Sequence, residues 1–148
     1  MSTIFDPTVR AALAGRVRQL RPDTPRKWGQ MTASAMQAHL IAGARMALGT
    51  LAVAPKRTLL ANPVGRWLAI HSPLPWPKGL PTAPELQDPP GANFEAEREE
   101  LLRLTEALGQ RGQELPWPKH PGFGQLTARD WGVLIWRHTD HHLRQFGL

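Results

Sequence analysis

Two histidines near the C-terminal end of the chain, His138 and His142, stand four residues apart, and a third, His39, lies far earlier. An α-helix turns by ~100° per residue, so positions i and i+4 project from one side with Cβ atoms ~5–6 Å apart. Imidazoles at that spacing can share one ion, as they do in the helical His-x-x-x-His pairs of zinc proteins. The chemistry that these residues predict is the binding of one divalent metal ion.

The stretch that carries the pair has the pattern of an amphipathic helix. The apolar side chains that share a face with both histidines at helical spacing are Trp131, Ile135 and Phe146. The charged side chains on the opposite side are Arg137, Asp140 and Arg144. The two imidazoles are therefore expected to point into the protein, and the charged side chains are expected to point outward.

His39 shows the same pattern in an Ala- and Met-rich stretch that favours helix. Residues on its face are Ala35, Met36, Leu40, Gly43 and Met46. Gln37 and Arg45 are expected outside that face. His39 is therefore predicted to point inward as well.

Three buried imidazoles need partners for their ring nitrogens, because a buried polar atom without a hydrogen bond is costly. A metal ion would satisfy one lone pair on each ring. The alternative is that each histidine is hydrogen-bonded to other groups within the core. Three protein ligands leave a coordination position open, which is the pattern of catalytic sites. An ion held in this way can lower the pKa of a water to about 7 or bind a thiol as thiolate.

Three other side chains are candidates near this site. His141 lies ~80–100° from the histidine face and is expected at its edge. His120, in a Pro- and Gly-rich stretch, is a candidate fourth ligand or general acid–base group, or a histidine that only orders its loop. Gln145 is expected on the side of the helix that faces the site, where it could hydrogen-bond a ligand histidine or a substrate. The alternative is an amide that lies at the edge of the core without a role in the site.

The elements that must position these residues are helices. Asp6 and Asn93 suit helix N-caps, and Thr127 with Asp130 resembles a capping box. Gly49 suits a helix end, and Pro63 must start the third helix late or kink it. No strand is evident, so the fold class is all-α. Helices are expected over about 7–20, 32–49, 57–70, 93–110 and from the Thr127 cap to about 146.

Two proline-rich connections separate these helices. Residues 71–91 contain seven prolines, which excludes a helix or a central strand. A connection of this length is either a functional cover or a passive wrap over the helices. Residues 112–126 form the second connection, and His120 lies in it.

Length and composition narrow the classes further. With 148 residues, the chain is predicted to be one domain over 1–148. It has no cysteine, which excludes disulfides, Cys-containing zinc sites and a cysteine nucleophile, so any sulfur nucleophile must come from a bound cofactor. The N-terminus lacks the features of a signal peptide, and no apolar stretch approaches the ~20 residues that span a bilayer. We expect a cytoplasmic protein with no membrane partner.

The formal charge of +6 does not predict nucleic-acid binding. Arginines are spread over the chain, and no basic-aromatic stripe or nucleic-acid-binding motif accompanies them. The expected partner is a small-molecule substrate or thiol.

Three segments resemble the DinB-like superfamily, the YfiT-related metal-binding four-helix bundles. They are Trp28–His39, His120–Thr127 and Trp131–Phe146, which cover most of the two ends of the chain, whereas residues 50–92 show no specific match. The resemblance implies an up-down-down-up four-helix bundle, a nickel or zinc ion on His39, His138 and His142, and frequent dimers. Some relatives transfer or isomerise substrates with low-molecular-weight thiols, and some are hydrolases.

Two functions follow as predictions. The first is a metal-dependent enzyme, either a transferase of the thiol-cofactor type or a hydrolase. The second is a non-catalytic, stress-associated module in which the ion is structural or the protein binds a small ligand. Trp136 and Leu143 lie off the metal face, so they predict a second packing surface, either a homodimer interface or a contact with a neighbouring helix.

Overall fold

The computed structural model describes residues 1–56, 62–79, 82–87, 90–91, 93–113 and 116–148. The regular elements among these residues are helices, and none is a β-strand. An isolated bridge between His120 and Gly124 is the one extended pairing among them. The all-α class predicted from the sequence is confirmed for this part of the chain. Its helices are α1 (Pro7–Gln19), α2 (Ala33–Leu48), α3 (Pro63–His71), the short 3₁₀ helix η2 (Pro84–Leu86), α4 (Phe94–Arg111) and α5 (Ala128–Gln145).

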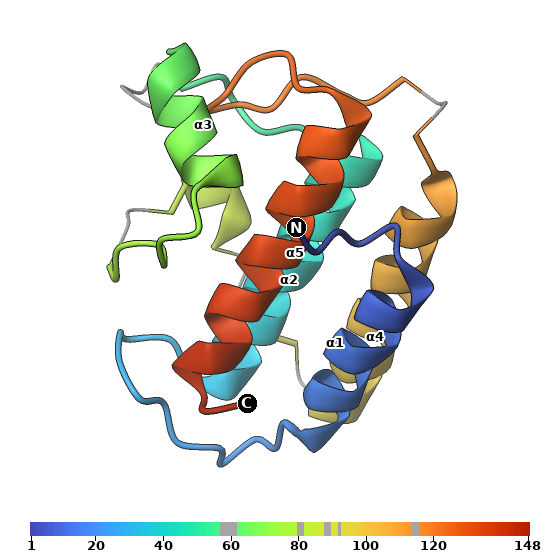
Figure 1. The fold of residues 1–148 in the computed structure, drawn as a ribbon. Coiled ribbons are helices and arrows are strands. Elements are labelled where there is room, and N and C mark those ends of the chain that lie inside the picture. Colours follow the sequence, from blue (N-terminus) through green and yellow to red (C-terminus); the bar gives the residue numbers. More distant parts are fainter. Residues whose placement is uncertain (57–61, 80–81, 88–89, 92, 114–115) are drawn as a thin grey trace.

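The four long helices pack against one another, with α2 and α1 both contacting α4 and α5. In Figure 1, α1 and α5 run in one direction and α2 and α4 in the other. The shorter α3 lies at the periphery and packs on α5, while η2 packs on α2. The two helices predicted to carry the metal ligands, α2 and α5, are therefore in contact.

Side-chain caps fix where the helices begin. Asp6 accepts hydrogen bonds from the backbone N–H groups of Thr8 and Val9 at the start of α1. Thr127 and Asp130 form the predicted capping box of α5. Gly49 ends α2 in the left-handed conformation, with φ of 80°. These bounds agree with the sequence expectations to within a residue or two.

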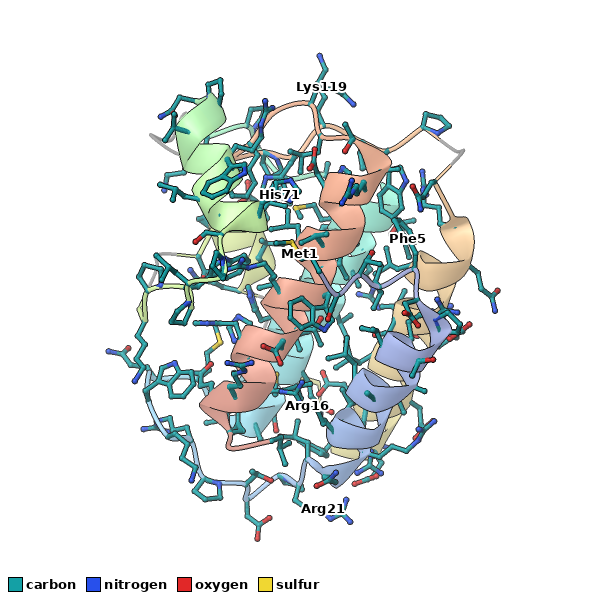
Figure 2. The ribbon with its side chains drawn as sticks, viewed as in Figure 1. Met1, Phe5, Arg16, Arg21, His71 and Lys119 are labelled. Atoms are coloured by element: carbon teal, nitrogen blue, oxygen red, sulfur yellow. The ribbon has the colours of Figure 1, made fainter. Side chains whose placement is uncertain are left out.

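The third helix begins at Pro63, as expected if proline forces a late start, because proline suits the first turn of a helix. The part of the predicted helix over 57–61 lies outside the described residues. At its C-terminal end, α3 is tied to α5 by two side chains. Arg137 donates to the carbonyl oxygens of Ile70, Ser72 and Leu74. His71, whose side chain reaches toward α5 (Figure 2), is hydrogen-bonded to Asp130 at 2.7 Å.

Helix α2 is buried on more than one side because it lies against both α4 and α5. The expectation that Gln37 lies outside the inward face is wrong, since this side chain is fully buried. Its Nε2 donates to the carbonyl oxygen of Phe94 at the start of α4. A helical wheel of α2 shows the face that points inward, but it cannot show that a second helix covers an adjacent face.

None of the described helices has the length and apolar character needed to cross a membrane.

Replacing Thr127 with Ala tests the local rule that starts α5. The change removes the acceptor for the Asp130 backbone N–H, so we expect a loss of about 1 kcal/mol in the free energy of unfolding. Urea unfolding followed by circular dichroism measures it. Thr8→Ala, in the exposed first turn of α1, is the matched control and should change stability much less. Equal losses in both variants would contradict the capping assignment.

Candidate metal centre

Three histidines from two helices meet at one point in the structure. His39 comes from α2, and His138 and His142 come from α5. One ring nitrogen of each lies within 4.8 Å of the others, and the ring centroids are 4.8–4.9 Å apart. The Nε2 atoms of His39 and His138 are only 2.9 Å apart. The predicted convergence of these imidazoles is therefore present.

The three rings differ in how much solvent reaches them. His39 and His142 are buried, whereas His138 is partly exposed. The His138 ring packs on Gly43, one turn after His39, where a Cβ would be at van der Waals distance, 3.4 Å from its Cε1 atom. His138 is therefore the least buried residue of the three, although its ring is enclosed enough that burial is the main cause of its lowered pKa.

A backbone carbonyl fixes the proton on His39. Its Nδ1 lies 2.9 Å from the carbonyl oxygen of Leu86, which can only accept a hydrogen bond. Nδ1 must therefore donate, and in the neutral ring Nε2 keeps the lone pair. Leu86 is the last residue of η2, so the proline-rich connection supplies this contact.

A side-chain amide does the same for His142. The Nδ1 atom of His142 lies 3.0 Å from Oε1 of Gln145, and Nε2 of Gln145 donates to the carbonyl oxygen of Trp28. The carbonyl of Trp28 sets the orientation of the amide, so its oxygen faces His142 and Nδ1 of that ring must donate. His142 therefore keeps its lone pair on Nε2.

The backbone at Gly29 makes room for this amide. Its φ is 77°, a left-handed conformation, and a Cβ at this position would stand 2.4 Å from the Gln145 Nε2 atom. Gln145 thus contacts a candidate ligand histidine, which is one of the roles that the sequence left open. Whether it also contacts a substrate stays a prediction.

Burial keeps the three rings neutral. It lowers the pKa of His142 to about 3, with the neighbouring His39 adding to the effect. The pKa of His138 is held well below its ordinary value, first by burial and then by His142 and His39. Burial also lowers the pKa of His39, although its hydrogen bond to Leu86 opposes the shift. Neutral imidazoles are the form that binds a metal ion.

The cluster fits a divalent ion with small adjustments of the rings. Nitrogen ligands of tetrahedral zinc lie ~2.0–2.1 Å from the ion and hence roughly 3.3 Å from one another. The observed range extends from 2.9 Å to at most 4.8 Å. Without an ion, the nitrogens of His39 and His138 can face each other at 2.9 Å only if His138 donates its Nε2 proton. His39 and His142 present fixed lone pairs to the same point, so the donor set suits a cation.

Aromatic side chains lie beside His138 and His141. Trp76, from the proline-rich connection, has its ring centroid 6.0 Å from that of His138 and 5.8 Å from that of His141. His141 also contacts Trp28, at 6.0 Å between centroids, and is partly buried, at the edge of the cluster as predicted. The group of described residues that could share an ion contains no carboxylate.

His120 is not a member of that group. Its Nδ1 accepts hydrogen bonds from the backbone N–H groups of Gly122 and Phe123, and its ring packs on Trp131. Nε2 therefore carries the proton of the neutral ring, so in this geometry His120 offers a donor rather than a metal-binding lone pair. The contacts are those of a histidine that orders its loop. Its role as an acid or base stays a prediction.

Sequence reasoning missed the Leu86 and Trp28 carbonyls and the packing of Trp76 on His138. Backbone carbonyls carry no residue-type signal, and all three contacts come from irregular segments. The one available signal was the proline content of residues 71–91. It predicted an irregular connection that is either a functional cover or a passive wrap, without indicating which residues it contacts.

Comparison with known proteins identifies no relative. No protein-family model, no curated protein and no solved structure matches the chain. The functional argument therefore depends on the geometry of the site and on the resemblance of its sequence motifs.

Replacing His120 with Asn tests whether burial suppresses the pKa of this ring. Burial lowers that pKa from 6.5 to about 4, so below pH 6.5 the unfolded chain takes up a proton that the folded protein refuses. Stability should therefore fall as pH falls from 6.5 to 4, with His120 contributing about 3 kcal/mol of the loss. Asn can still accept the backbone hydrogen bonds but does not titrate.

The measurement is urea unfolding of chelator-treated wild type and His120→Asn across this pH range. We expect the variant to lose less stability than the wild type between pH 6.5 and 4. Parallel curves for the two proteins would mean that the folded state protonates His120 normally.

Proposed function

We propose that this protein binds one divalent metal ion through Nε2 of His39, His138 and His142 and uses the open coordination position in catalysis. The activity is that of a metal-dependent transferase of the thiol-cofactor type or of a hydrolase, acting on a small molecule. The observation that carries the proposal is the convergence of three neutral imidazoles, two of which, His39 and His142, have their lone pairs fixed by hydrogen bonds on their far sides.

The ion would supply Lewis acidity for a water or thiol bound at the open position. The residues of the chain provide the rest. Leu86 and Gln145 hold the protons of His39 and His142 on Nδ1, which orients both rings. A substrate would approach at His138, the least buried residue of the three, where the Trp76 ring packs beside it.

We also propose that the chain is DinB-like, with an up-down-down-up four-helix bundle and nickel or zinc as its ion. The helix directions in Figure 1 support this topology, because the first and last long helices run opposite to the second and third. The supply of one ligand by the second helix and two by the last also supports it. Three imidazoles suit several borderline divalent ions, so zinc and nickel are proposals of equal standing.

A structural ion in a non-catalytic module is the second candidate. Two of the three rings are buried, and no carboxylate that could serve as a general base belongs to the described cluster. In that case the ion would stabilise the contact between α2 and α5 without turnover. Chelation would then lower the melting temperature of a protein that has no detectable chemistry.

Replacing His138 with Ala tests whether this histidine binds the ion and the neighbouring His141 does not. We expect the wild type, purified without affinity-column metal, to carry roughly one divalent ion per chain by elemental analysis. His138→Ala should lower the affinity for the ion by more than the about 10–100-fold that is typical of removing an outer hydrogen-bond partner. His141→Ala, three residues along the same helix, is the matched control and should retain the ion.

Activity is tested on the same three proteins with thiol adducts, amides and esters. Turnover should disappear on chelation, return when the ion is restored and be absent from His138→Ala, whose circular dichroism should show a folded chain. Metal content that is equal in all three proteins, or turnover unchanged by chelation, would contradict the proposal.

A further inference from the structure

Helix α3 presents an apolar face to solvent. Among the described residues, four of the five large apolar side chains that are exposed lie on α3 or just after it: Val64 (68% exposed), Trp67 (54%), Leu68 (48%) and Leu74 (64%). Val64, Trp67 and Leu68 have i, i+3 and i+4 spacing, so they share one side of the helix. Ile70, in the last turn of α3, is fully buried. We call the four exposed side chains the α3 face.

The surroundings of the α3 face are basic. No Asp or Glu occurs from residue 24 to residue 84. Arg66 lies on α3 and donates to the carbonyl oxygen of Gln125. Lys78, seven residues after the end of α3, has its Nζ 4.6 Å from the centroid of the Trp28 ring. The backbone N–H of Lys56 donates to the carbonyl oxygen of Pro121, which places the exposed Lys56 beside the loop that also carries Lys119.

Two carboxylates lie among these groups, and one of them, Glu85, is close enough to Lys56 for this cation to contribute to its lowered pKa. Asp130 accepts from Thr127 and is hydrogen-bonded to His71, while Glu85 accepts from the backbone N–H of Ala54. Figure 2 shows Lys119 at the end of the molecule where α3 begins, pointing outward. Cations therefore outnumber carboxylates around the α3 face.

A second copy of the chain is a poor match for this surface. Two α3 faces brought together would oppose basic groups to basic groups. Helix α4 is rich in acidic residues and lies on the far side of the molecule from α3 (Figure 1), yet none of the exposed large apolar side chains is on it. It offers charge complementarity without an apolar surface to cover Trp67 and Leu68.

We propose that the α3 face attaches the protein to an anionic lipid surface. A helix whose exposed side carries Trp, Leu and Val, flanked by Lys and Arg, has the composition of elements that lie in the interface of a bilayer. The apolar side chains enter the acyl boundary while the lysines meet anionic headgroups, which adds attraction for each cation near the surface. The sequence predicted no membrane partner because nothing spans a bilayer, but attachment at the surface needs no span.

Flotation with lipid vesicles tests the proposal on the full chain. The wild type should float with phosphatidylcholine vesicles that contain phosphatidylglycerol, should stay behind with pure phosphatidylcholine, and should be released by salt. Val64→Gln combined with Leu68→Gln should weaken the binding by roughly ten-fold or more, because it removes the apolar contribution. Both residues are exposed, and circular dichroism checks that the variant is folded.

A pair of charge variants isolates the electrostatic contribution. Lys119→Gln, beside α3, should weaken vesicle binding by roughly five-fold. Arg103→Gln removes the same charge from α4, where the side chain is 66% exposed, and should have little effect. Equal effects of the two changes would overturn the proposal, as would wild-type binding that ignores phosphatidylglycerol.

Sedimentation of the same proteins provides the remaining outcome. We expect the wild type and the Val64→Gln/Leu68→Gln variant to have the same oligomeric state. A wild-type dimer that this variant converts to monomers would identify the α3 face as an interface between copies and overturn its assignment to lipid.

Discussion

Three imidazoles can share one metal ion only if each ring is neutral and turns a lone pair toward that ion. This constraint explains features far apart in the chain. The Leu86 carbonyl and the Gln145 amide hold the protons of His39 and His142 on the outer nitrogens. Burial lowers the pKa values of all three rings, which favours their neutral forms. The contact of α2 with α5 brings the rings together.

The helices and their inward faces were accessible from the sequence because they follow from local rules. The Thr127–Asp130 capping box and the Gly49 stop depend on residues within one turn of each helix end. The convergence of His39 with the α5 pair is a contact between distant segments. Periodicity alone allowed it, since both stretches placed histidine among their apolar residues. The resemblance of the motifs then selected it over separate core histidines.

The rest depended on contacts that residue types do not encode. The burial of Gln37 requires knowing that α4 covers a second side of α2. The orientation of Gln145 requires the Trp28 carbonyl, which a loop delivers with the left-handed backbone of Gly29 beside it. The proline-rich connection was predicted to be irregular, yet its contribution of the Leu86 carbonyl and the Trp76 ring depends on a path that no periodic pattern describes.

X-ray absorption at the metal edge of the purified protein tests the central claim most directly, because it reports the atoms around the ion. The account predicts three imidazole nitrogens at ~2.0–2.1 Å for zinc, one or more oxygen ligands from solvent, and loss of one imidazole in a His39→Ala protein. A spectrum with only oxygen ligands, or one that the His39 substitution leaves unchanged, would contradict a shared site between α2 and α5.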